Sequence, residues 1–150
     1  MTKNNIVAEV GLTYKSKQPV SSLPQITDPQ SAATILRPLF DEDTMQLQEQ
    51  FIVLMLNADK RCLGWSLISK GSSTGTIVDL KHIFQIVLLS NGESFILAHN
   101  HPGGRLKASP ADLTLTRQVQ QAGKLLNITL DDHIILSSEG YLSMKAKGLF

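Results

Sequence analysis

The hydrophobic positions along the chain either alternate with polar ones or run together, in a way that predicts six strands. Residues 50–56 form a nearly continuous apolar run, which is typical of a strand covered on both faces. A hairpin turn is predicted at residues 57–60, and a second hairpin around Glu139-Gly140 closes the chain. The other five predicted strands span residues 6–14, 62–70, 94–98, 134–137 and 141–144.

Three segments between these strands have the spacing of amphipathic helices. Asp28 followed by Pro29 supplies an N-cap and a proline at the first helical position, which predicts a helix over residues 28–41. Two further helices are predicted over residues 79–91 and 109–126. The order β-α-β-β-α-β-α-β-β implies an α/β fold in which the helices pack on a mixed sheet.

Length and composition fit a single domain of this kind. The 150 residues are 42% hydrophobic and 18% charged, as expected for a chain that buries a substantial core. We assign residues 28–150 to the α/β domain. Residues 1–27 are interpreted as an N-terminal strand and a connecting arm rich in Ser, Pro and Gln.

Charge and cysteine content narrow the classes of function. The formal net charge is +1, without the basic excess of proteins that bind nucleic acid through its phosphates. Cys62 is the only cysteine, so neither an internal disulfide nor a cysteine-based zinc cluster can form. The N-terminus lacks the apolar core of a signal peptide, and the apolar runs are too short to span a bilayer. We expect a cytoplasmic protein without a membrane partner.

Two histidines at the end of a predicted strand indicate metal chemistry. In extended backbone the side chains of His99 and His101 lie on the same side, and Pro102 biases His101 toward extended geometry. A helix that begins at Ser109 places Asp112 in its first turn, where the carboxylate can face the strand end. Two imidazoles and one carboxylate, with a fourth position left for water, are the pattern of a catalytic zinc site.

Other interpretations of these residues stay open at this point. Ser109 and Asp112 also have the spacing of a capping box, which would explain that pair without a metal. The capping box explains neither the two histidines nor the Gly-Gly turn that follows them. A third imidazole, His133, lies at the entry of a predicted strand. It would replace Asp112 as a ligand, orient a ligand through an outer contact, or simply cap the strand. The chain lacks a His-Glu-x-x-His motif, and one cysteine excludes the zinc-deaminase signature.

A zinc hydrolase also needs a general base near the metal. Glu49 stands directly before the strand at residues 50–56, and Glu93 lies six residues before His99. From the residues alone, an exposed acid at a strand end is the better explanation of Glu49. Both glutamates are therefore candidates.

The spacing of the metal candidates resembles a known motif. His99-x-His101-Pro102, followed after six residues by Ser109-x-x-Asp112, resembles the JAMM motif of the JAB/MPN metalloprotease superfamily, and its RadC-like branch in particular. The resemblance covers residues 28–150. Further segments that fit the RadC-like branch are Thr116-Arg117, Asp132-His133-Ile134-Ile135 and Gly148-Leu149-Phe150.

This resemblance implies a fold, a site and an activity. The fold would be cytidine-deaminase-like, with a curved mixed sheet flanked by helices. One zinc ion would be bound by His99, His101, Asp112 and a water molecule. Glu49, two residues before a phenylalanine, would match the general acid and base, and Ser109 the residue that hydrogen-bonds the oxyanion. The superfamily hydrolyses peptide and isopeptide bonds, so the expected partner is a peptide or protein substrate.

Two departures from the RadC-like pattern bear on function. Residues 103–108 keep the spacing of the family's Ser-Gly-Asp-Pro-Thr-Pro run but change its residues, and hence the rim of the site. The helix-hairpin-helix segment of longer RadC proteins is not found in these 150 residues, so DNA binding has little support beyond the family's DNA-repair label. The hydrolase is the leading hypothesis, ahead of a catalytically idle metal-binding interaction module and of a DNA-associated factor.

Overall fold

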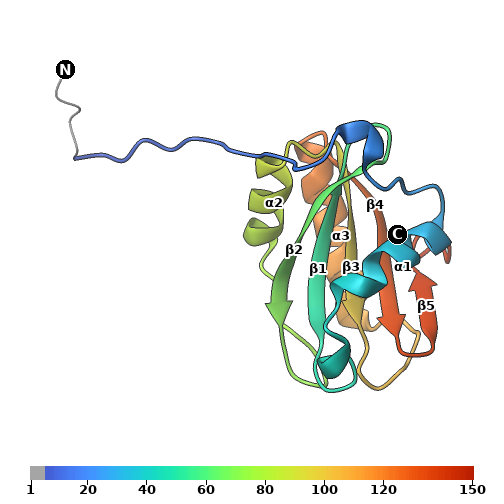
Figure 1. Cartoon of the computed structure of the whole chain (residues 1–150). Coiled ribbons are helices and arrows are strands. Elements are labelled where there is room, and N and C mark those ends of the chain that lie inside the picture. Colours follow the sequence, from blue (N-terminus) through green and yellow to red (C-terminus); the bar gives the residue numbers. More distant parts are fainter. Residues whose placement is uncertain (1–5) are drawn as a thin grey trace.

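A five-stranded mixed sheet runs through the centre of the computed structural model, which describes residues 6–150 (Figure 1). The strands lie in the order β2-β1-β3-β4-β5, and only β3 and β4 are parallel neighbours. Their bounds are β1 Gln50–Leu56, β2 Cys62–Lys70, β3 Ser94–Asn100, β4 Thr129–Ser137 and β5 Gly140–Ser143.

Helices cover both faces of this sheet. Helix α1 lies in front of the sheet in Figure 1, and α3 lies behind it. The bounds of the helices are α1 Pro29–Leu36, α2 Leu80–Leu89 and α3 Pro110–Leu125, with short 3-10 helices at Val20–Ser22, Arg37–Leu39 and Glu42–Thr44. Among the described residues, no helix is long and apolar enough to cross a lipid bilayer.

Every residue of β1 and of β3 is buried, which confirms the prediction that the strand at residues 50–56 is covered on both faces. Alternate side chains point to opposite faces, as strand geometry requires. Ile52, Leu54, Ile96 and Ala98 pack in the cluster that includes α1. Phe51, Val53, Phe95 and Leu97 pack in the cluster that includes α2 and α3.

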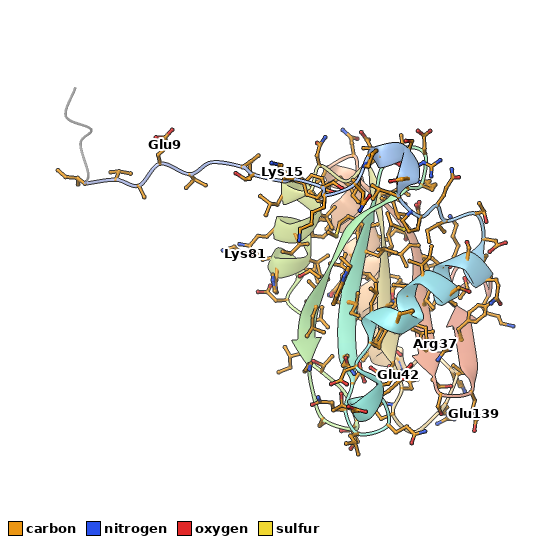
Figure 2. The ribbon with its side chains drawn as sticks, in the orientation of Figure 1. Glu9, Lys15, Arg37, Glu42, Lys81 and Glu139 are labelled. Carbon is orange, nitrogen blue, oxygen red and sulfur yellow. The ribbon has the colours of Figure 1, made fainter. Side chains whose placement is uncertain are left out.

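The predicted strand at residues 6–14 is wrong. This segment, which includes Glu9, forms no strand and extends away from the sheet as an arm (Figure 2). Val10 and Leu12 are 90% and 79% exposed. Alternating apolar residues give a segment the propensity for a strand, but a strand forms only by pairing, and residues 6–14 are not among the strands of the described sheet.

Three predicted boundaries also need correction. The first helix ends at Leu36 rather than near residue 41, because a 3-10 turn that contains Pro38 follows it. Strand β3 continues to Asn100, and β4 begins at Thr129 rather than residue 134, because the two strands pair in parallel from Ser94 to Asn100. Pairing with a buried neighbour thus overrides the low strand propensity of the polar residues at these ends.

Side chains also join elements that are distant in the chain. Arg37, at the end of α1 (Figure 2), donates hydrogen bonds of 2.8 and 3.0 Å to the carbonyls of Ser137 and Gly140. Asp28 caps α1 in a capping box with Ser31, as the N-cap prediction required. Helix α1 is therefore fixed at its first turn by its own cap and at its end by the β4–β5 hairpin.

The turn from α3 into β4 generates a prediction about packing. Gly123 is buried, and a Cβ atom added there would lie 2.5 Å from the carbonyl oxygen of Ile128. Gly123→Ala should lower the free energy of unfolding by about 1–3 kcal/mol through this overlap, although alanine is the better helix former. Urea denaturation measures the difference. Gly103→Ala is the control, since its Cβ would meet nothing within 4 Å; equal stability of the two variants would contradict this packing.

Candidate metal centre

The two histidines of the His-x-His pair lie at the end of β3, on the face of the sheet that packs against α3. His99 is inside the strand, opposite Phe51 of β1 and Ile135 of β4, and is fully buried. His101 follows the strand end, and 17% of its side chain is exposed. A buried imidazole and a half-buried one therefore stand side by side, with ring centroids 4.8 Å apart.

Asp112 reaches both histidines from the first turn of α3. Its Oδ2 accepts a 2.8 Å hydrogen bond from the Ser109 backbone N–H, and Ser109 Oγ accepts one of 3.0 Å from the Asp112 N–H. The capping box predicted as an alternative is thus present. The same carboxylate lies 3.3 Å from His99 Nε2 and 3.4 Å from His101 Nε2. Capping and metal binding therefore do not exclude each other here.

The three side chains direct their ligand atoms at one point. One ligand atom from each of His99, His101 and Asp112 lies within 4.8 Å of the other two, and the two Nε2 atoms are 2.9 Å apart. His101 Nδ1 lies 2.6 Å from the Arg105 carbonyl oxygen, which can only accept, so Nδ1 carries the proton and Nε2 of the neutral ring holds a lone pair. A zinc-type cation would displace any Nε2 proton shared with Asp112, and two Nε2 lone pairs and a carboxylate oxygen would then face one point.

The protonation equilibria of these groups depend on one another. Burial raises the pKa of Asp112, but hydrogen bonds with His101 and His99, attraction to His99 and the Ser109 N–H outweigh it, so the pKa lies well below its usual range. The hydrogen bond with Asp112 raises the pKa of His101, against the opposing effect of burial. Asp112 is thus held as a carboxylate, which is the form that binds a metal.

Glu49 lies next to this cluster. Its backbone N–H donates to the Ser72 carbonyl at 3.0 Å and its carbonyl accepts from the Gly71 N–H at 2.8 Å, which fixes the residue at the mouth of β1. Glu49, His101, Ser109 and Asp112 line one cavity of about 720 Å³. Burial raises the pKa of Glu49, with a smaller opposing effect from His99.

Glu93 is placed at the opposite end of the sheet. Its N–H donates to the carbonyl of Leu56, the last residue of β1, while Glu49 stands before the first. Because β1 has seven residues, the two glutamates are separated by about 20 Å along the strand. The structure therefore brings Glu49, and not Glu93, to the histidines.

His133 stands behind the cluster rather than in it. The ring is fully buried, and its Nε2 lies 2.7 Å from His99 Nδ1. Its Nδ1 lies 2.7 Å from Thr116 Oγ1. Burial lowers the pKa of His133 well below its usual value, with His99 adding to the effect. Of the three roles considered for His133, contact with a ligand fits this position, whereas replacement of Asp112 and simple capping of the strand do not.

Two polar residues in contact with the site were not expected from the sequence. Asn100, between the two histidines, points to the other face and is fully buried; its amide donates to the carbonyls of Met45 and Gln48, and its Oδ1 accepts from the Gln50 N–H. Thr116 is buried in α3, one turn after Asp112. The signal for both is a polar residue at a position that the strand or helix period places inside.

The cavity opens between two loops. Ser73–Thr76 contribute to one wall, and the loop after His101 contributes to the other. Arg105 and Lys107, in the loop that departs from the RadC-like pattern, are exposed and line the cavity. The cluster is thus accessible from outside, as a catalytic site requires.

Comparison with known proteins identifies the family. The model of the RadC-like JAB domain matches residues 26–149. A UPF0758 protein of Flavobacterium johnsoniae is 34% identical over 147 residues, which are 97% of this chain and 63% of that protein. UPF0758 proteins of Thermosynechococcus vestitus and Cyanothece sp. are 40% and 39% identical over 80% of this chain and 47% and 48% of their own length.

The chain thus spans about half to two thirds of the length of these curated relatives, whose name states no activity. The matched region contains the whole sheet, all three helices and the His99, His101 and Asp112 cluster. A five-stranded mixed sheet flanked by three helices is consistent with the JAB/MPN fold. The chain belongs to the RadC-like JAB domain family.

Proposed function

We propose that this chain is a zinc-dependent hydrolase of the JAMM type, which cleaves a peptide or isopeptide bond in a peptide or protein substrate. The observation that carries the proposal is the convergence of His99, His101 and Asp112 beside Glu49, in an open cavity. An interaction module that only holds a metal needs neither an acid beside the ligands nor an accessible cavity.

His99, His101 and Asp112 would hold the metal through two Nε2 atoms and a carboxylate oxygen. When bound, the ion supplies a Lewis acid that activates water and polarises a carbonyl group. Three protein ligands of this type leave a position for water, as in catalytic zinc sites. The substrate would enter between Ser73–Thr76 and the loop after His101.

Glu49 would move the proton. Its carboxylate accepts a proton from the attacking water and delivers it to the leaving amine, which is general base and then general acid catalysis. Burial raises the pKa of Glu49, and a carboxyl whose pKa is nearer to neutral exchanges a proton more readily in both directions. The backbone hydrogen bonds to Ser72 and Gly71 hold Glu49 in place for this role.

Ser109 would stabilise the negative charge that develops on the carbonyl oxygen. Its Oγ already accepts a hydrogen bond from the Asp112 N–H. A hydroxyl has one donor and two acceptor positions, so the Ser109 proton can still be donated into the cavity that the residue lines. Donors of this kind, fixed before the reaction begins, contribute most when water is excluded.

Asn100 would position Glu49 through hydrogen bonds to the backbone on both sides of it. Its three hydrogen bonds, of 2.7 to 3.0 Å, go to the backbone of Met45, Gln48 and Gln50, on both sides of Glu49 in sequence. The buried amide therefore links the strand that carries the histidines to the segment that carries the general base.

The metal is the first test. Purified protein should contain about one equivalent of zinc by elemental analysis, held by two histidines and one aspartate. A variant with both His99→Ala and Asp112→Ala should lose it, because only one ligand remains. His82→Ala is the control, since His82 lies outside the cluster. Full zinc content in the double variant would overturn the ligand assignment.

The general base is the second test. Glu49→Gln should keep its zinc and its circular dichroism spectrum but lower the rate of peptide hydrolysis by about 10²–10⁴, because the amide cannot take a proton. A peptide library with mass-spectrometric detection supplies the substrate. Glu93→Gln, at the far end of β1, should match the parent protein. Zinc-loaded parent protein that cleaves neither the library nor ubiquitin-like isopeptides would favour the idle module instead.

The contacts of Asn100 give a third test. Asn100→Ala leaves the Gln50 N–H and two carbonyls without their partner, and each unsatisfied buried group costs about 1–3 kcal/mol. The variant should unfold at lower urea concentration and hydrolyse peptide more slowly at unchanged zinc content. Asn57→Ala, which loses a bond from the Arg61 N–H in a hairpin turn, should keep its activity. An active Asn100→Ala would show that Glu49 needs no such support.

A further inference from the structure

A chain of buried hydrogen bonds leads from His99 back to helix α3. His99 Nδ1 lies 2.7 Å from His133 Nε2, and His133 Nδ1 lies 2.7 Å from Thr116 Oγ1. Thr116 Oγ1 in turn donates to the backbone carbonyl of Asp112 at 2.6 Å. The path begins and ends at two of the candidate ligands, because Asp112 supplies a carboxylate on one side and a carbonyl on the other.

The direction of each hydrogen bond follows from the last acceptor. The carbonyl of Asp112 can only accept, so Thr116 donates its single hydroxyl proton to it. Toward His133, the Thr116 oxygen then acts as an acceptor, and His133 Nδ1 must carry the proton. A neutral imidazole has one N–H, so with that proton on Nδ1 the His133 Nε2 holds a lone pair toward His99.

His99 therefore donates from Nδ1 to His133, which leaves the Nε2 of a neutral ring with a lone pair. That Nε2 is the atom which faces His101 and Asp112. In the opposite tautomer the proton would sit on Nε2 and occupy the position at which the metal binds. The backbone carbonyl of Asp112 thus determines, through Thr116 and His133, which nitrogen of His99 is available to bind a metal.

The ring orientations are held as well. Phe51 stacks on His99 with an angle of 8° between the ring planes and a centroid distance of 5.8 Å. The same phenylalanine meets His133 edge-on at 5.6 Å. Neither imidazole can rotate without displacing a buried aromatic ring, so the hydrogen-bond directions stay fixed.

We propose that Thr116 and His133 are positioning residues that hold His99 in its Nδ1–H tautomer and so set the affinity of the metal centre. The proposal rests on the metal site of the proposed function but not on hydrolysis. Outer partners of this kind typically contribute a factor of about 10–100 in metal affinity. The contribution should be large here, because His99 is fully buried and water cannot replace His133 as its acceptor.

The test compares two threonines of the same helix. Thr116→Val keeps the side-chain shape but removes the acceptor for His133, and should lower zinc affinity about 10–100-fold in competition with a chromophoric chelator. Thr116→Ser restores the hydroxyl and should restore the affinity. Thr114→Val is the matched control, because Thr114 Oγ1 makes the same kind of bond to Pro110, on the exposed side of the helix. Parent-like affinity in Thr116→Val would overturn the proposal.

A second measurement needs neither a variant nor a bound metal. Long-range ¹H–¹⁵N correlation spectra of the metal-free parent protein report which ring nitrogen of each histidine is protonated. Nδ1–H on both His99 and His133 is expected, and a His99 ring that is protonated at Nε2 but not at Nδ1 would overturn the proposal. If the parent protein binds no zinc, the proposed function fails, while this spectrum still decides whether the two residues fix the tautomer.

Discussion

The antiparallel register of β1 and β3 is the constraint on which the site depends. Phe51 pairs with His99, so the beginning of β1 and the end of β3 meet at the same edge of the sheet. Glu49 precedes one strand and His101 follows the other, and both line the cavity. A shift of one residue would turn His99 to the other face, away from Asp112. Both strands are buried on two faces, which makes such a shift costly.

Several polar side chains are buried near this end of β1 and β3. Burial of a polar group is costly unless the group is hydrogen-bonded. His99, Asn100, Thr116 and His133 are all buried, and each is hydrogen-bonded. Among residues 6–150, no buried side-chain nitrogen or oxygen lacks a partner. The α1 side of the sheet receives Asn100, which holds the segment around Glu49, and the α3 side receives the histidines. The buried polar contacts that hold Glu49 therefore lie on one face of the sheet, and those that hold His99 lie on the other.

The hydrophobic pattern predicted much of the fold, because elements that are buried by their neighbours have apolar residues at regular positions. The strand at residues 50–56 and the N-cap at Asp28 were predicted correctly, since continuous burial and a capping box leave local signals. The alternation at residues 6–14 was misleading, because propensity does not supply a pairing partner. Spacing could not decide between Glu49 and Glu93, because the choice depends on which end of β1 lies beside the histidine end of β3. The contacts of Thr116 and His133 arise only when α3 and β4 pack together.

Asp112 shows how helix stability and metal chemistry share one side chain. Each carboxylate oxygen has two acceptor positions, so Oδ2 can accept from the Ser109 N–H and still face His101. The positive end of α3 stabilises the same charge. His101 is held by the Arg105 carbonyl and His99 by His133, so every candidate ligand has a partner within the protein. The fold therefore sets the ligand geometry, as in a preorganised catalytic site, whereas in a structural zinc site the ion itself supplies the folding energy.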